Sequence, residues 1–194
     1  GAVTTLTFQR QQAHQAEAYQ DIVLALADAM GYSTAGLFTS NYGYGSTMIS
    51  MAKQELEFYQ ANNLEGGQRY WGIAGEARFG NPNAYDPTQP WCVAFVNACA
   101  YQCGFIGPDG WFAEENWPFW CAGIYSSLLR GNHGTGHDTK GDTYKPVPGD
   151  LIFFGDGVGC QLPDHIGIVE YVDSEGRVHT IEGNSNNRVQ RCVY

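Results

Sequence analysis

Residues 164–184 read DHIGIVEYVDSEGRVHTIEGN, two apolar runs on either side of a polar tetrapeptide. Ile166–Val172 and Arg177–Glu182 are rich in the β-branched and aromatic residues that favour strands. The tetrapeptide DSEG between them has the composition of a tight turn. The stretch therefore predicts an antiparallel β-hairpin.

Further strands are predicted on both sides of this hairpin, at residues 150–154 (DLIFF) and 189–194, whereas the earlier part of the chain has a helical pattern. Helices are predicted at residues 8–30, from Ser46 to just before Asn62, from Cys92 to about Cys103, and at 119–129; loops are predicted at 31–45, 62–90 and 131–142. Because the helices come first and the antiparallel strands after, the fold class is α+β, with N-terminal helices packed on an antiparallel sheet.

The composition limits both the size of the fold and its ligands. With 194 residues the chain is long enough for one well-packed domain. Its formal net charge of −10 makes a surface that repels nucleic acid and anionic membranes. No apolar run reaches the length of about 18 residues that a transmembrane helix needs. Neither nucleic acid nor the membrane interior is therefore expected as a partner.

One cysteine lies where a predicted helix begins. Cys92 follows an irregular stretch in the sequence PWCVAFV, residues 90–96. Unpaired N–H groups and the helix dipole at such a position lower the pKa of a thiol from its ordinary value of about 8.5, and the same groups can stabilise an oxyanion. Gln89 is a further candidate donor to that oxyanion. The alternative is a packing role, which we expect for most of the other cysteines, with Cys160 and Cys192 as the candidates for a disulfide.

A nucleophilic thiol needs a base, and His165 is the best placed of the five histidines. It stands at the entry to the first hairpin strand, where Gly167 leaves room for a close approach by another group. Glu182 and Asn184 lie at the far end of the returning strand, so hairpin pairing brings them beside His165. Either side chain could accept a hydrogen bond from the imidazole and orient it.

The register of the hairpin decides whether these side chains share a face. A three-residue turn, Ser174–Gly176, pairs Asp173 with Arg177 and turns Glu182 away from His165. A four-residue turn, or a bulge at Gly183, puts Glu182 and Asn184 on the same face as His165. A catalytic triad requires one of these two arrangements.

The motifs PWCVAFV, VPGDLIFF, DHIGIVEYV and VHTIEGNSN, in this order and spacing, resemble those of the CHAP family, the cysteine, histidine-dependent amidohydrolases/peptidases. The family is related to NlpC-type cell-wall peptidases and more distantly to papain, and the resemblance is closest to CHAP modules of Gram-positive conjugative mobile elements. It implies a papain-like or NlpC-like fold with the nucleophile at a helix N-terminus. The resemblance covers residues 46–194, which we expect to be the catalytic domain, and leaves residues 1–45 outside as an N-terminal helix and linker.

Carried over residue by residue, the resemblance makes Cys92 the nucleophile, His165 the general base and Glu182 the orienting acid, with Asn184 also in the active site. The implied function is a peptidoglycan hydrolase that cuts an amide bond, as a stem or cross-bridge endopeptidase or as an N-acetylmuramoyl-L-alanine amidase. Its partners would be peptidoglycan stem peptides, and its place extracellular or cell-wall associated in a Gram-positive bacterium. A preceding wall-hydrolase domain is expected in the full-length protein, because such modules often follow a lysozyme-like one.

Two other functions fit the same residues: a thiol peptidase or transferase that acts on a protein, and a catalytically silent wall-binding module. No cofactor and no metal ion are expected. Some CHAP domains carry an aspartate-rich calcium loop before the cysteine, but GEARFGNPNAYDPTQP, residues 75–90, has no DxD pattern. His133 and His137 are interpreted as part of a solvated loop.

Overall fold

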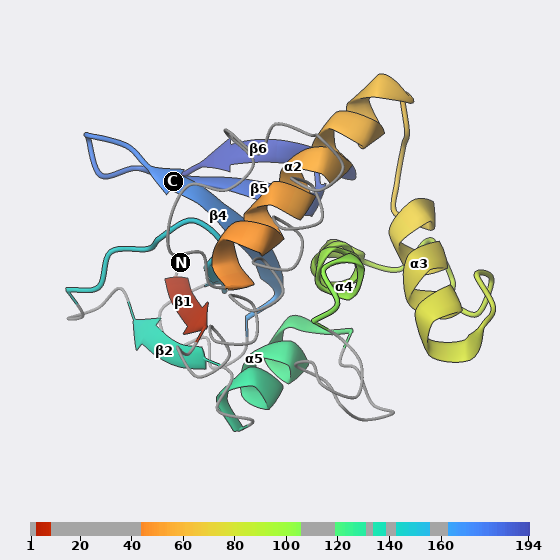
Figure 1. Ribbon diagram of the computed structural model, residues 1–194, viewed down its shortest axis with the longest axis horizontal. Coiled ribbons are helices and arrows are strands. Elements are labelled where there is room, and N and C mark those ends of the chain that lie inside the picture. Colours follow the sequence, from red (N-terminus) through yellow and green to blue (C-terminus); the bar gives the residue numbers. More distant parts are fainter. Residues whose placement is uncertain (1–2, 9–43, 106–118, 131–133, 139–142, 156–162) are drawn as a thin grey trace, which may run out of the picture.

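The computed structural model describes residues 3–8, 44–105, 119–130, 134–138, 143–155 and 163–194, which form four helices and one six-stranded sheet (Figure 1). The elements are β1 (Val3–Phe8), α2 (Tyr44–Ala61), α3 (Gln68–Phe79), α4 (Cys92–Gln102), α5 (Cys121–Arg130), β2 (Gly134–Asp138), β3 (Leu151–Phe154), β4 (His165–Val172), β5 (Val178–Ser185) and β6 (Arg188–Val193). The predicted α+β class, with helices packed on an antiparallel sheet, is confirmed.

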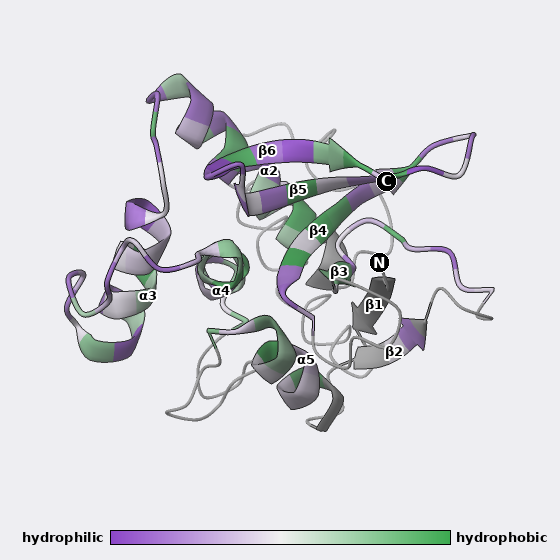
Figure 2. Cartoon of the chain, turned by 180° about the vertical axis from the view of Figure 1, so that it is seen from behind, coloured by the Kyte–Doolittle hydropathy of each residue, from purple (hydrophilic) through white to green (hydrophobic). Residues whose placement is uncertain are grey.

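The sheet has the strand order β2-β1-β3-β4-β5-β6, and every neighbouring pair is antiparallel. Helix α2 lies across β4, β5 and β6, in front of them in Figure 1 and behind them in the reverse view of Figure 2. Helix α4 contacts β4 and β5 beside α2, and α3 packs against α4. The core therefore lies between the sheet and the α2–α4 pair, with α4 at its centre.

Most predicted elements are confirmed: the helices at α2, α4 and α5, the hairpin β4–β5, and the strands β3 and β6. Two predicted loops are partly wrong, because 62–90 contains α3 and 131–142 contains β2. Strand β1 was not predicted, and Phe8 is its last residue; the rest of the helix predicted at 8–30 lies outside the described residues.

Helix α3 was not predicted because its sequence, QRYWGIAGEARF, contains two glycines, which lower helix propensity. Its buried residues Tyr70, Trp71, Ala74 and Gly75 nevertheless recur at helical spacing. Tertiary contacts stabilise the helix: Tyr70 stacks on Trp91 with 5.5 Å between ring centroids. Packing against the rest of the molecule thus outweighs a weak local preference.

A buried charged cluster joins the three helices. The carboxylate of Glu55 on α2 is 4% exposed and accepts two hydrogen bonds of 2.8 Å from Arg69 on α3. Gln102 on α4 donates a third, at 3.0 Å. Because a buried carboxylate needs such partners, this cluster fixes α3 and α4 relative to α2.

The start of α4 is held in place by Trp91. Its ring is 2% exposed, stacks on Tyr70, and donates a hydrogen bond of 3.1 Å from Nε1 to the Asn187 side chain in the β5–β6 turn. At Gly183 the strand β5 comes so close to α4 that a Cβ atom there would lie 2.3 Å from Cβ of Phe95. The absence of a side chain at Gly183 therefore allows α4 to lie directly on β5.

We expect Gly183→Ala to lower the free energy of unfolding by about 2 kcal/mol or more, because the new methyl group overlaps two rigid rings of the core. Urea denaturation followed by circular dichroism measures the change. Gly72→Ala is the matched control: its Cβ would have no neighbour nearer than 3.8 Å and would lie in a helix, so a stability between unchanged and about 1 kcal/mol higher is expected. Equal unfolding midpoints for Gly183→Ala and wild type would contradict the close approach of α4 and β5.

Candidate active site

Cys92 is the first residue of α4 and is 4% exposed. The first hydrogen bond of the helix runs from the Phe95 N–H to the Trp91 carbonyl, at 2.9 Å, so the N–H groups before Phe95 lack helical acceptors. One of them, the Val93 N–H, donates to the Cys92 sulfur and lowers the pKa of the thiol. The N-terminal turn of α4 thus presents donors to negative charge at this position.

The hairpin β4–β5 has the three-residue turn, in which the Asp173 N–H donates to the Arg177 carbonyl at 3.0 Å. This turn alone would direct Glu182 away from His165. The register shifts, however, between Val169 and Tyr171, where Glu170 has no partner on β5. The extra residue in β4 moves the pairing by one position, which is a β-bulge.

The bulge brings Gly167 opposite Glu182, and a Cβ atom on Gly167 would lie 2.8 Å from Cγ of Glu182. His165 and Glu182 therefore share a face, as the predicted triad requires, but the shift arises at Glu170 in β4. Neither of the two predicted arrangements produces this shared face, because the turn has three residues and the irregularity beside Gly183 lies in the pairing of β5 with β6. The space at Gly167 is filled by the Glu182 side chain.

Ion pairs hold the bulge residue. Glu170 is 7% exposed and accepts hydrogen bonds of 2.8 and 3.1 Å from Arg191 on β6. Lys53 on α2 lies 3.6 Å from the same carboxylate. Burial raises the pKa of Glu170, but Arg191 and Lys53 more than offset this, so its pKa is below the ordinary value and the carboxylate is charged.

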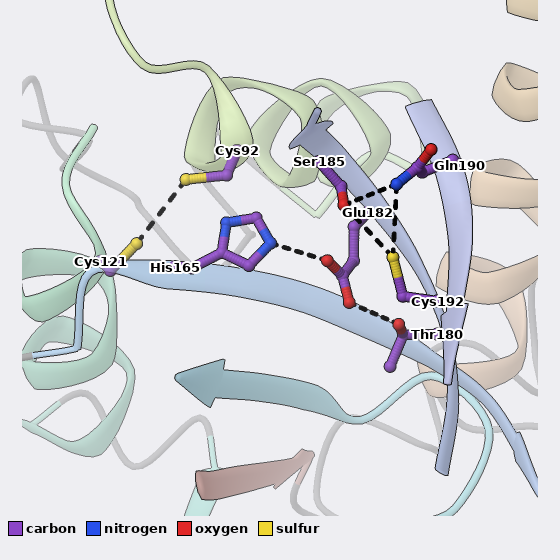
Figure 3. Close-up of polar contacts among 8 residues, drawn as sticks. All are labelled: Cys92, Cys121, His165, Thr180, Glu182, Ser185, Gln190 and Cys192. Atoms are coloured by element: carbon purple, nitrogen blue, oxygen red, sulfur yellow. Dashed lines mark hydrogen bonds and ion pairs between the residues drawn. The ribbon is translucent and has the colours of Figure 1, made fainter. Parts of the chain in front are cut away.

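Glu182 is fully buried and holds the His165 ring. Its Oε2 atom accepts a hydrogen bond of 2.7 Å from His165 Nε2, and its Oε1 atom accepts one of 2.5 Å from the Thr180 hydroxyl (Figure 3). Burial raises the pKa of Glu182, but the hydrogen bonds from His165 and Thr180 lower it by more, so the side chain is an anion. This anion fixes both the orientation and the tautomer of the imidazole.

The His165 ring lies between Glu182 and Cys92, with its second nitrogen on the side of the sulfur (Figure 3). Burial opposes the charged imidazole, but hydrogen bonds with Cys92 and Glu182 prevail and raise the pKa of His165 to about 9. The pKa of Cys92 falls to about 5: a hydrogen bond from Cys121 is the largest cause, burial opposes it, and His165 adds to it. Near neutral pH the pair is therefore a thiolate and an imidazolium.

Cys121 is a member of this site that the sequence did not reveal. It is the first residue of α5, is 4% exposed, and its Sγ atom lies 3.8 Å from that of Cys92. The bond to Cys92 and burial raise the pKa of Cys121, so it stays a thiol and acts as the donor. No spacing or motif marks Cys121 in the sequence, because a separate segment of the chain brings it to Cys92.

Asn184 and Gln89 are placed differently from the other predicted residues. Asn184 is half-buried at the end of β5 with a φ of 60°, and no hydrogen bond among the described residues joins it to His165. The geometry thus gives Glu182 as the partner of the ring. The side chain of Gln89 is exposed and its amide donates a hydrogen bond of 3.1 Å to Asp86, so its role as an oxyanion donor stays a prediction.

The structure describes one member of each of two further residue pairs considered in the sequence, Cys160 with Cys192 and His133 with His137. Cys192 is a free thiol in contact with the Ser185 hydroxyl at 3.3 Å, while Cys160 lies outside the described residues. His137 on β2 stacks on Tyr144 with 3.8 Å between ring centroids, and His133 is outside the described residues. In the part of the chain that the structure describes, no three His, Cys, Asp or Glu side chains are grouped as metal ligands would be.

The chain matches the family model described as CHAP domain over residues 83–184, just over half of its length. The matched region runs from the loop before α4 to the end of β5 and so contains Cys92, His165 and Glu182. No curated protein and no solved structure matches the chain significantly.

We expect Gly167→Ala to displace Glu182 from His165 while the fold persists, since the new methyl group meets a flexible side chain. Without its carboxylate partner His165 would have a lower pKa and would stabilise the Cys92 thiolate less. The rate of Cys92 alkylation by iodoacetamide at pH 7 should fall by about two-fold or more. Gly72→Ala serves again as the control, and a Gly167→Ala protein that reacts as fast as wild type would contradict this arrangement.

Proposed function

Because the chain belongs to the CHAP domain family, whose members are amidases and peptidases, we propose that it is a cysteine hydrolase that cleaves an amide bond of bacterial peptidoglycan. The observation that carries this proposal is the placement of the His165 ring between the Cys92 sulfur and a buried carboxylate, with 2.7 Å between His165 Nε2 and Glu182 Oε2. A thiol, a base and an oriented base partner are the groups that nucleophilic cleavage of an amide requires.

In the proposed reaction the Cys92 thiolate attacks the amide carbonyl carbon. The oxyanion forms beside the N-terminus of α4, where the Cys92 backbone N–H can donate to it. The His165 imidazolium gives its proton to the leaving amine, and a thioester with the enzyme remains. A cysteine at the start of a helix and a histidine on a strand support the papain-like arrangement that we propose for this site.

Hydrolysis of the thioester reverses these roles. Neutral His165 takes a proton from water as the water attacks the thioester, and the acid product leaves as the thiolate is restored. Glu182 stays ionised throughout and stabilises the imidazolium of the resting and final states. Its role is to hold the ring, because its carboxylate is fully buried and contacts His165, away from the sulfur.

Peptidoglycan stem peptides are the proposed substrate because the family acts on cell walls, which also suggests an extracellular or wall-associated protein. In the family, the bond is a stem or cross-bridge peptide bond or the amide between muramic acid and L-alanine. Within the described residues, no helix is long and apolar enough to cross a membrane. A silent binding module is disfavoured because it would not need the buried pair of Glu182 and His165.

We expect Cys92→Ala to release no peptidoglycan fragments, a loss of about 10³-fold or more, because the thioester cannot form. Cys92→Ser should be similarly impaired, since a hydroxyl is not ionised by this site near neutral pH. The measurement is the release of soluble fragments from purified peptidoglycan, identified by mass spectrometry. Cys103→Ser, at the opposite end of α4, is the matched control that should keep activity.

Two outcomes would overturn the proposal. Wild-type release of fragments by Cys92→Ala would remove the cysteine from the chemistry. Cleavage of a panel of unfolded proteins, with purified muropeptides left intact, would favour the alternative of a thiol peptidase that acts on a protein.

A further inference from the structure

Two helices begin with cysteines that face each other at the candidate active site. Cys92 opens α4 and Cys121 opens α5, and their sulfur atoms are 3.8 Å apart (Figure 3). Sulfur atoms in a disulfide are about 2.05 Å apart, so a displacement of about 2 Å shared by two side chains would join them. No other two cysteine sulfur atoms among the described residues are within hydrogen-bonding distance.

We propose that Cys92 and Cys121 form a reversible disulfide when a hydroperoxide oxidises the protein, and that this bond switches the nucleophile off. The proposed disulfide rests on the short distance between the two sulfur atoms. Its effect on activity rests on the proposed function, in which the Cys92 sulfur must be free to attack a carbonyl.

The first step begins with the thiolate of Cys92. The thiolate attacks one oxygen of the hydroperoxide and breaks the O–O bond, which gives a sulfenic acid on Cys92 and an alkoxide or hydroxide. His165, a cation beside the sulfur, supplies the proton that turns this leaving group into an alcohol or water. In this step the sulfur loses two electrons and the peroxide gains them.

In the second step the Cys121 sulfur attacks the sulfenic sulfur. The S–O bond breaks, the S–S bond forms, and the oxygen leaves as water with the thiol proton of Cys121. Over both steps, two thiols and one hydroperoxide give one disulfide, one water and one alcohol, or two waters when the oxidant is hydrogen peroxide. Two thiols from a reductant reverse the change by exchange.

Two further cysteines among the described residues, Cys99 and Cys103, lack this combination. Cys99 is fully buried in α4, and burial raises the pKa of its thiol well above the ordinary value. Burial also raises the pKa of Cys103, to about 12, at the far end of the same helix. Burial raises the pKa of Cys192 as well. Among the described cysteines, oxidation should therefore begin at Cys92.

Cys121 would also protect the nucleophile from permanent damage. A sulfenic acid with no thiol beside it reacts with a second peroxide and becomes a sulfinic acid, which ordinary thiols do not reduce. With Cys121 at contact distance, condensation to the disulfide competes with this loss. The two cysteines together therefore allow a reductant to restore the Cys92 thiol after oxidation. A single active-site cysteine without a neighbouring thiol does not have this protection.

The test is peptide mapping of the intact chain after treatment with hydrogen peroxide, with and without later dithiothreitol. In the wild type we expect a peptide pair linked through Cys92 and Cys121, which dithiothreitol separates, together with recovery of at least about half of any hydrolytic activity. In Cys121→Ser we expect no linked pair, sulfinic acid at Cys92, and no recovery. Cys103→Ser, the matched control, should behave as the wild type does.

A wild-type protein that gives no Cys92–Cys121 peptide pair, or one that links Cys92 to another cysteine, would overturn the proposal. So would equal conversion of Cys92 to sulfinic acid in wild type and in Cys121→Ser. Mass spectrometry of the wild type gives this answer even if the variant does not fold. A linked pair in a protein that cleaves no peptidoglycan would leave the disulfide standing and count against the proposed function alone.

Discussion

A fully buried carboxylate must be protonated or paired, and the pairing of Glu182 with His165 is the interaction on which the candidate site depends. It keeps the imidazole in one orientation and keeps it charged. It also requires that two strands meet in one register, because a shift of one residue would turn Glu182 to the opposite face. The bulge at Glu170 supplies that register, and the missing side chain at Gly167 supplies the space.

Contacts around the start of α4 position the Cys92 sulfur. Trp91 packs between α3 and the β5–β6 turn, and Gly183 lets α4 lie against β5 one residue after Glu182. The same strand therefore carries the carboxylate that holds the base and the close contact that holds the helix of the nucleophile. Strand β5 therefore helps to set the position of Cys92 relative to His165.

Local pattern was enough to predict α4, the hairpin, and Cys92 and His165 as candidates, with Glu182 or Asn184 as the partner of the histidine. It was not enough for β2, whose sequence has no strand pattern and which pairs with β1 far away in the chain. The bulge at Glu170 was missed because its stabilising partners, Arg191 and Lys53, lie on other elements. Cys121 was missed for the same reason, since only the tertiary fold brings its sulfur to Cys92.

The central claim, that Cys92 and His165 are an ion pair held by Glu182, is tested most directly by an NMR titration of the His165 imidazole. The account predicts that His165 stays protonated up to a pKa of about 9, and that its pKa falls in both Cys92→Ala and Glu182→Gln, because each variant removes a negative partner of the imidazolium. Titration of His165 near the ordinary value of 6.5 in the wild type, unchanged in both variants, would contradict it.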